Sequence, residues 1–270
     1  MKNNTAVFSL AFLFSVLVHT ASADHQHEGD ESVPIPADKV IHLASLNWPP
    51  YTGSSLPGQG ATVSVLRAAL HEMGYGLQVD FYPWVRAVSL ASDNASMYAG
   101  FFPVYFNSET AQSFIYSSEA GSGPLGFAEN TSKPVNWHSL NDLKSFSIGV
   151  VAGYNNTEEF DSMVADKLLQ VHPVVIDKQN IRKVAYGRID LAVIDRNVLH
   201  YMLSTDPELR PLSAKVRMNA HLLESKQLFV CFKRSLPHLA DILDEGLRRI
   251  DVPRIQQAYM DDLLSRQRVL

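Results

Sequence analysis

A tryptophan and an arginine in the first third of the chain have side chains suited to recognising a small ligand. Trp48 follows an apolar, strand-like stretch and precedes Pro49-Pro50. Open α/β sheets bind ligands beyond the carboxyl ends of their strands, where an indole can stack on an apolar or cationic group. The alternative is a tryptophan packed in the core. Arg86 could meet an anionic group of a ligand, or only solvent.

The turn Gly153-Tyr154-Asn155 is a second candidate binding element. It precedes a predicted helix whose N-cap would be Asn156, with Glu159 three residues later as in a variant capping box. Free backbone N–H groups at a helix N-terminus attract anions. The turn can therefore receive a carboxylate, or it is a purely structural cap.

The sequence contains no recognised catalytic motif. Ser-x-x-Lys, Gly-x-Ser-x-Gly, His-Glu-x-x-His and phosphate-loop patterns are all missing. Cys231 is the only cysteine and lies in an apolar run, which indicates a buried, inert thiol. His25 and His27 form a His-x-His pair, a weak metal site compared with the alternative of a solvated tail. We therefore expect no enzyme activity, no metal and no cofactor.

The N-terminus has the layout of a secretory signal peptide, residues 1–23. Lys2 precedes an apolar run at 6–18, and Ala21-Ser22-Ala23 is a small-x-small cleavage site. A membrane anchor is the weaker alternative, because a span needs about 20 apolar residues. Residues 24–37 are polar and acidic, which predicts a disordered leader.

The remaining chain is long enough for one large domain or two small ones. Its charge balance is mildly acidic, with a formal net charge of −5 for the whole sequence. No basic stripe is visible, which argues against nucleic-acid binding. No second long apolar run occurs, so we expect a soluble mature protein.

Hydrophobic periodicity predicts a first unit of alternating strands and helices. The strands are expected at 40–46, 77–81 and 97–104, and the helices at 61–72 and from 84 to 91. This alternation is typical of a sheet with crossover helices.

The second part of the chain repeats the alternation, which predicts a second α/β unit of similar size. Its expected elements are strands at 147–151, 174–176, 191–194 and 222–232, helices after Asn156 and at 181–186, and a helix over 236–264 interrupted at Pro253.

Six local patterns then follow one another along residues 40–260. They are the aromatic-x-Pro-aromatic loop 48–51, Pro83-Trp84, Phe-Ile-Tyr-Ser at 114–117, Leu-Asn-Asp-Leu at 140–143, the turn 153–155 and the run 187–195. Their order and spacing resemble the bacterial extracellular solute-binding proteins of family 3, the polar amino acid type of periplasmic binding protein.

The resemblance implies a type II periplasmic-binding-protein-like α/β fold, a Venus flytrap with two lobes joined by two crossing hinge strands. Lobe 1 would hold residues 38–123 and 231–270, and lobe 2 residues 124–230. A small-molecule ligand would bind in the cleft between them. Such proteins are periplasmic monomers that deliver a solute to an ABC-type inner-membrane transporter permease or to a sensor.

The resemblance also implies roles for single residues. Asp195 matches the position that accepts the ligand's ammonium group, the alternative being a surface carboxylate paired with Arg196. Trp84 matches an aromatic wall position, or it anchors a helix start. Phe102 and Tyr105 replace small hydroxyl residues of the family, which implies a flatter, more apolar pocket unless they pack beneath the loop.

Thr110 stands where the family has an arginine that grips the ligand carboxylate. A hydroxyl cannot replace a two-pronged cation, so we expect a ligand with a cationic amine that need not carry a carboxylate. The alternatives are a dehydratase-like enzyme using Glu109, Glu119 and Arg86, or a sensory partner protein without a transporter. The expected ligand-binding residues are Trp48, Tyr51, Trp84, Arg86, Phe102, Tyr105, Tyr154, Asn155 and Asp195.

Overall fold

One mixed sheet runs through residues 36–267, the part of the chain that the computed structural model describes. Its strands are ordered β2-β1-β3-β9-β5-β8-β6-β7, and β4 pairs with β9 beside this path. The predicted signal peptide and nearly all of the predicted leader lie outside the described residues. No helix among the described residues has the length and apolar character to cross a bilayer.

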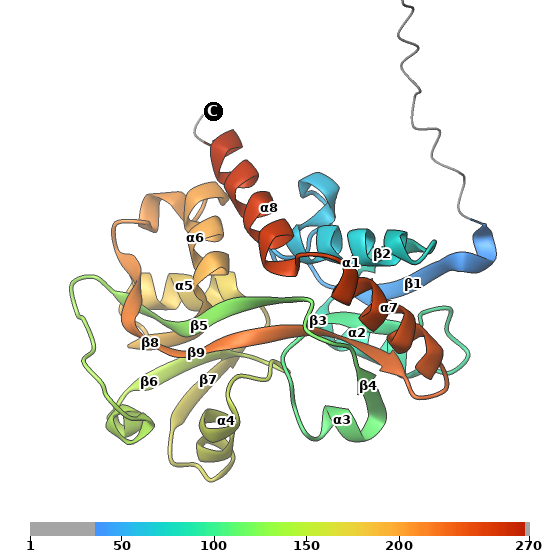
Figure 1. The fold of residues 1–270 in the computed structure, drawn as a ribbon. Coiled ribbons are helices and arrows are strands. Elements are labelled where there is room, and N and C mark those ends of the chain that lie inside the picture. The colour runs from blue at the N-terminus through green and yellow to red at the C-terminus, as the bar shows by residue number, and fades with distance from the viewer. Residues whose placement is uncertain (1–35, 268–270) are drawn as a thin grey trace, which may run out of the picture. The chain divides into compact units, whose positions relative to one another are not determined.

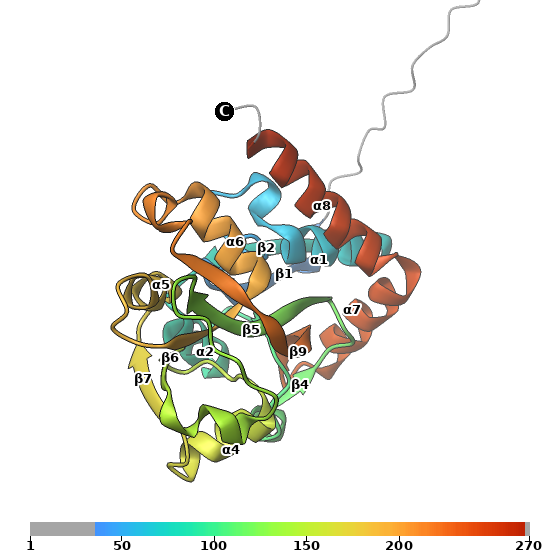
Figure 2. The same ribbon diagram turned by 90° about the vertical axis from the view of Figure 1, so that its left-hand side faces the viewer.

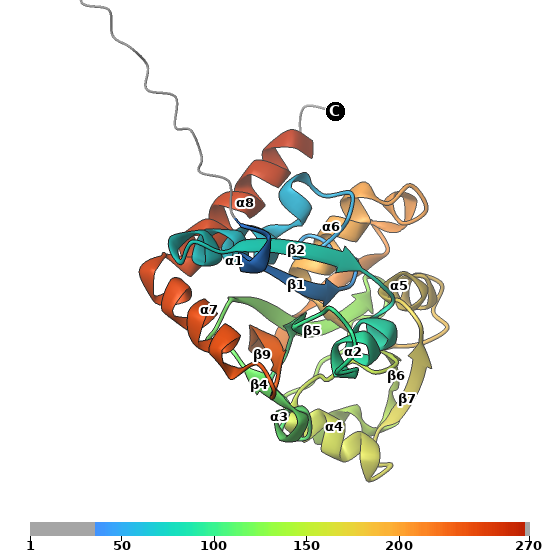
Figure 3. The same ribbon diagram turned by 90° about the vertical axis from the view of Figure 1, so that its right-hand side faces the viewer.

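The first half of the sheet is built around β1, which pairs in parallel with β2 and β3. The strands of this half are β1 (Val40–Ser45), β2 (Gly76–Phe81), β3 (Gly100–Val104), β4 (Phe114–Tyr116) and the end of β9 (Val216–Lys233). Its helices are α1 (Ala61–Glu72), α2 (Trp84–Ser92), the short α3 (Thr110–Ser113) and α7 (Pro237–Arg249). Figure 3 shows α2 on the side of the strands away from α1 and α7.

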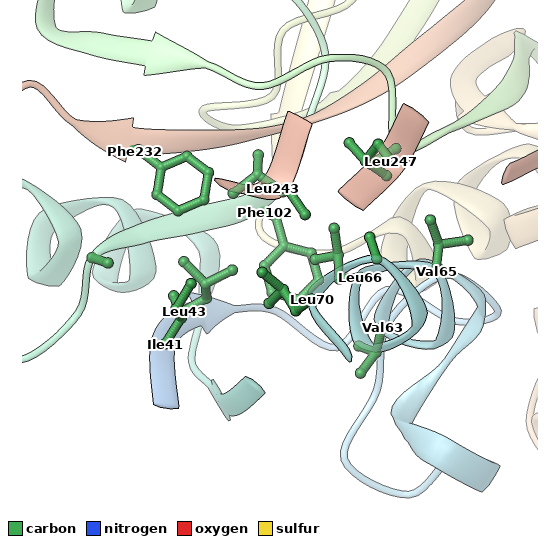
Figure 4. Packing of buried hydrophobic residues seen from close by; sticks show 14 of the residues in the cluster. Ile41, Leu43, Val63, Val65, Leu66, Leu70, Phe102, Phe232, Leu243 and Leu247 are labelled. Atoms are coloured by element: carbon green, nitrogen blue, oxygen red, sulfur yellow. The ribbon is translucent and has the colours of Figure 1, made fainter. Parts of the chain in front are cut away.

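The core of this half lies mainly between the sheet and the pair α1 and α7. Leu43, Leu66, Phe102 and Leu243 meet there with almost no exposed surface (Figure 4). Gly246 lets the two helices touch, because a Cβ there would stand 2.1 Å from the carbonyl oxygen of Ala69.

The second half of the sheet has β5 at its centre. β5 (Gly121–Asn130) pairs antiparallel with β8 (Leu191–Asp195) and with β9, and β6 (Ser147–Val151) pairs in parallel with β8 and with β7 (Gln170–Val174). Figure 2 shows α5 and α6 on one side of these strands and α4 on the other. These helices are α4 (Glu158–Ala165), α5 (Asp177–Ala185) and α6 (Arg196–Thr205).

The long strand β9 belongs to both halves of the sheet. Its residues 216–228 run beside β5, as Figure 1 shows, and its last residues pair with β3 and β4. The C-terminal helix α8 (Val252–Gln267) contacts this region through Gln256, whose Nε2 donates to the carbonyl oxygen of Ser122 at 2.6 Å.

Four local predictions were wrong. Helix α5 covers 177–185 rather than 181–186. The N-cap of α4 is Thr157, whose hydroxyl accepts from the Phe160 N–H, while Asn156 bonds to Asp161 instead. Strand β7 covers 170–174 rather than 174–176. The break in the C-terminal helix precedes Pro253, which lies in the first turn of α8, where a missing N–H does no harm.

Candidate functional site

A small cavity lies where strand ends from both halves of the sheet meet. It follows β1, β3 and β6 and touches β9, and its volume is about 40 Å³. That volume holds about three water molecules, whereas small-molecule sites usually have about 300 Å³ or more. The lining residues are Leu46, Trp48, Trp84, Pro103, Val104, Tyr105, Tyr154, Asn155 and Leu228.

The first wall of this cavity is an aromatic stack on the loop after β1. A tight turn forms this loop, because the N–H groups of Tyr51 and Thr52 both donate to the Trp48 carbonyl oxygen at 3.1 Å. The rings of Trp48 and Tyr51 stack with centroids 4.7 Å apart, and Tyr105 meets Trp48 edge-on at 6.0 Å. Trp48 is 8% exposed, so it is both a packed residue and a cavity wall.

The second wall joins α2 to the turn after β6. Trp84 packs edge-on against Tyr154, with ring centroids 6.4 Å apart. Its indole Nε1 donates to the carbonyl oxygen of Gly153 at 3.1 Å. Tyr154 and Asn155 of this turn therefore line the cavity, whereas helix α4 begins only at Glu158.

Asp195 lies beside the cavity and is fully engaged by protein groups. It is the N-cap of α6 and is 1% exposed, so it is not the surface ion pair with Arg196 that was the alternative prediction. Its Oδ1 accepts from the N–H groups of Asn197 at 2.7 Å and Val198 at 3.1 Å. Its Oδ2 accepts from the Tyr51 hydroxyl at 3.1 Å.

Side chains from the two halves of the sheet thus form one buried hydrogen-bond network. Asn197 Nδ2 donates to the Tyr51 hydroxyl at 2.8 Å, so that hydroxyl both donates and accepts. Burial raises the pKa of Asp195 to about 7 against the lowering effect of its hydrogen bonds.

A second buried carboxylate, Asp177, was not predicted as a site residue. It is the first residue of α5 and is 7% exposed, on the same helix face as the buried Asn180, Ile181 and Val184. Burial, followed by the charge of Asp195, raises the pKa of Asp177 to about 7. The charge of Asp177 in turn helps to raise the pKa of Tyr105 and Tyr154.

Sequence reasoning missed Asp177 because it placed a strand at 174–176. In the structure, Val175 and Ile176 are exposed apolar residues, and the chain turns Asp177 inward as the helix begins. The usable signal was helical spacing, since 177, 180, 181 and 184 fall on one face of a helix. Lys226 of β9 was also missed; it is buried, with its Nζ 5.6 Å from the centroid of the Tyr105 ring.

The cavity does not include every predicted residue. Phe102 was predicted to face the ligand, but its side chain points into the core beneath α1 (Figure 4), because neighbouring residues of a strand face opposite sides. Arg86 is exposed, with its guanidinium 5.4 Å from the centroid of the Tyr82 ring, and it does not line the cavity. Thr110 bonds locally to Asn107 in the turn before α3.

The described residues hold no typical metal site, and their one cysteine is buried. No cluster of three metal-ligating side chains occurs among residues 36–267. Cys231 is fully buried, as predicted, and burial raises the pKa of its thiol to about 12. A buried thiol with so high a pKa is a poor nucleophile.

Comparisons with known proteins bear on the fold. No protein-family model matches the chain, and no curated protein sequence matches it either. Among solved structures, a histidine kinase sensor domain with similarity to periplasmic binding proteins matches at a TM-score of 0.70 and 15% identity, over 83% of this chain and 96% of that one.

Two ligand-bound structures are similar to the chain as well. An amino acid ABC transporter substrate-binding protein from Streptococcus pneumoniae, bound to L-arginine, matches at a TM-score of 0.66 and 15% identity, covering 84% of this chain and 95% of that one. The GluR0 ligand-binding core from Nostoc punctiforme, in complex with L-glutamate, matches at 0.64 and 16%, covering 82% and 98%. These likenesses show that the chain has the two-lobed, Venus-flytrap α/β fold predicted from the sequence.

Proposed function

We propose that this chain is an exported solute-binding protein that captures a small amine-bearing ligand between its two lobes and catalyses no reaction. The observation that carries the proposal is the pairing of an aromatic cavity with two buried carboxylates, Asp177 and Asp195, beside it. Aromatic faces and desolvated carboxylates both favour a cation.

The chemistry of the cavity supports a cationic ligand over an acidic one. Neither Asp177 nor Asp195 has an ion pair with a lysine or arginine in the described part of the chain. The arginine position of the resembled family is Thr110, whose hydroxyl bonds to Asn107. No charged side chain of a described residue lines the cavity itself. The charged residues near its wall are the two carboxylates and one lysine, Lys226, whose Nζ lies 5.6 Å from the centroid of the Tyr105 ring, so acidic groups outnumber basic ones there.

The candidate residues of the dehydratase alternative do not come together at the cavity. Glu119 accepts from the side chain of Gln227 at 2.8 Å, Arg86 packs on Tyr82, and Glu109 is the N-cap of α3. None of these three candidates lines the cavity. Capture of a ligand without turnover therefore fits the site better.

A ligand of ordinary size requires the cavity to open, as hinge-bending binding proteins do. Three side-chain hydrogen bonds beside the cavity would break in that opening: Trp84 to Gly153, Tyr51 to Asp195 and Asn197 to Tyr51. We propose residues 38–123 with 231–270 as one moving body and 124–230 as the other. The protein would then present the captured solute to a transporter permease or to a sensor.

A thermal-shift screen of the chain from Asp24 onward tests this function. The panel holds primary amines, amino acids, organic acids and small sugars. A ligand at about a hundred times its dissociation constant should stabilise the protein by about 2.7 kcal/mol, which raises the melting temperature. Stabilisation by amine-bearing compounds supports the proposal, and stabilisation only by amine-free acids contradicts it. Recovery of the unchanged ligand after incubation excludes turnover.

A further inference from the structure

The two buried carboxylates beside the cavity differ in how much hydrogen-bonding capacity they have left. A carboxylate offers about four lone-pair sites. Asp195 has three of them occupied by Asn197, Val198 and Tyr51. Beside the fourth, the backbone of Gly123 approaches so closely that a Cβ there would come within 2.1 Å of Oδ2.

Asp177 is in the opposite situation. Its one hydrogen bond is to its own backbone N–H, and no side-chain hydrogen bond or ion pair joins it to another described residue. The titratable groups that interact with it electrostatically are Asp195 and the neutral tyrosines Tyr105 and Tyr154. The neighbouring Lys178 points elsewhere, with its Nζ 2.8 Å from Asp206 Oδ2. A carboxylate buried without a cation is strongly unfavourable.

The helix start alone does not explain this buried carboxylate. An acidic residue in the first turn gains about 0.3–1 kcal/mol from the helix dipole. Desolvating a carboxylate costs several kcal/mol, as pKa shifts of about 3–5 units in buried groups show. The desolvation cost exceeds the gain from the dipole. An aspartate that served only to interact with the helix dipole would therefore lie on the exposed face of α5.

A buried polar atom without a partner lies on the cavity wall. The hydroxyl of Tyr105 is buried and has no hydrogen-bond partner. It belongs to a residue that lines the cavity and packs in one cluster with Ile181 of α5, and the charge of Asp177 helps to raise its pKa. A buried hydroxyl without a partner costs about 1–3 kcal/mol, so both groups favour a ligand that supplies N–H donors.

We propose that Asp177 and the Tyr105 hydroxyl bind the ligand's ammonium group directly, and that Asp195 is a positioning residue that holds Tyr51 and the start of α6. This inference rests on the proposed function and assigns the cation to a different residue from the one the family resemblance implies. An ammonium must offer at least two N–H groups to satisfy both contacts. The site therefore selects protonated primary or secondary amines over quaternary ammonium ions.

Calorimetric titrations at pH 8 test the assignment. The probes are ethanolamine, putrescine, L-ornithine and histamine, with choline as the trimethylated counterpart of ethanolamine. In the wild-type protein, at least one primary amine binds, and choline binds more weakly than ethanolamine. Asp177→Asn weakens the bound amine about 10- to 100-fold, as expected for a lost charge-assisted hydrogen bond. Tyr105→Phe weakens it about 3- to 10-fold.

The matched variants separate the possible outcomes. Asp241→Asn removes an equal charge from an exposed position in α7 and should leave affinity within about twofold. Asp195→Asn keeps an N-cap side chain and should weaken the amine less than Asp177→Asn does. The assignment is overturned if amines bind the wild type while Asp177→Asn and Tyr105→Phe leave their affinity unchanged. If no amine binds the wild type, the proposed function itself fails.

Discussion

Asp177→Asn should stabilise the ligand-free protein, and the stabilisation should grow with pH. The folded-state pKa of Asp177 is raised from 3.8 to about 7, chiefly by burial and then by Asp195. A carboxyl group whose pKa is raised by folding favours the folded state only while it is protonated. The wild type therefore loses stability as the pH rises through the range from about 4 to about 7.

The size of this effect follows from the same pKa. Each tenfold change in acid dissociation is worth about 1.4 kcal/mol, so the full rise would amount to about 4 kcal/mol above pH 7. Between pH 5 and pH 8 the expected gain of the variant over the wild type is about 2–3 kcal/mol. Loss of the helix-dipole contribution removes about 0.3–1 kcal/mol of it.

Urea denaturation at pH 5, 6, 7 and 8, followed by circular dichroism, measures this difference. In thermal melts the same gain appears as about 5–10 °C at pH 8, because 1 kcal/mol shifts a protein of this size by about 2–4 °C. Asp241→Asn is the control and should show a difference that is flat with pH. A variant that is less stable than the wild type at pH 8, or whose difference does not change with pH, would refute the reasoning.

The structure supports three further predictions. Tyr51→Phe removes the hydroxyl that bonds to both Asp195 Oδ2 and Asn197 Nδ2, and it should reduce the free energy of unfolding by about 1–3 kcal/mol in urea denaturation; a loss below about 0.5 kcal/mol would speak against these shared hydrogen bonds. Thr157→Ala should destabilise by about 1 kcal/mol in the same assay while Thr157→Ser does not, because only the hydroxyl caps α4. The Cys231 thiol should resist a thiol-reactive dye in the native protein and react in urea, and rapid native labelling would contradict its burial.

The sequence was most informative where one strong periodicity coincided with burial. Helix α1 spans the predicted residues 61–72 because Val63, Leu66 and Leu70 form a continuous apolar face. The elements of the second half were placed less well where apolar residues are exposed. Val175 and Ile176 resemble a strand by composition, but they lie on the surface after β7 has ended.

The sequence placed part of the cavity lining, and there is a physical reason why it could not place the rest. Cavity-lining aromatic residues at 48, 84, 105 and 154 were all among the predicted positions. On β3, however, the pairing with β9 shifts register between Phe101 and Val104. A shift of one residue exchanges the two faces of a strand, and Tyr105 follows the end of β3, so alternation along a regular strand could not place the residues near this strand end against the cavity. The burial of Asp177 depends on contacts between distant elements, which a single sequence does not display.

The hydrogen bonds that join the two sides of the cavity bear on how fast a ligand can enter. With Trp84 bonded to Gly153 and Tyr51 to Asp195, the cavity admits only a few water molecules. A ligand must wait for these contacts to separate, so the observed association rate should level off at high ligand concentration, at the rate of opening. The apparent affinity then contains the population of the open form as a factor. Substituting Trp84 with phenylalanine removes its hydrogen bond to Gly153 and would speed both entry and exit of the ligand. The indole N–H would thus determine how long a ligand stays bound as well as which ligand binds.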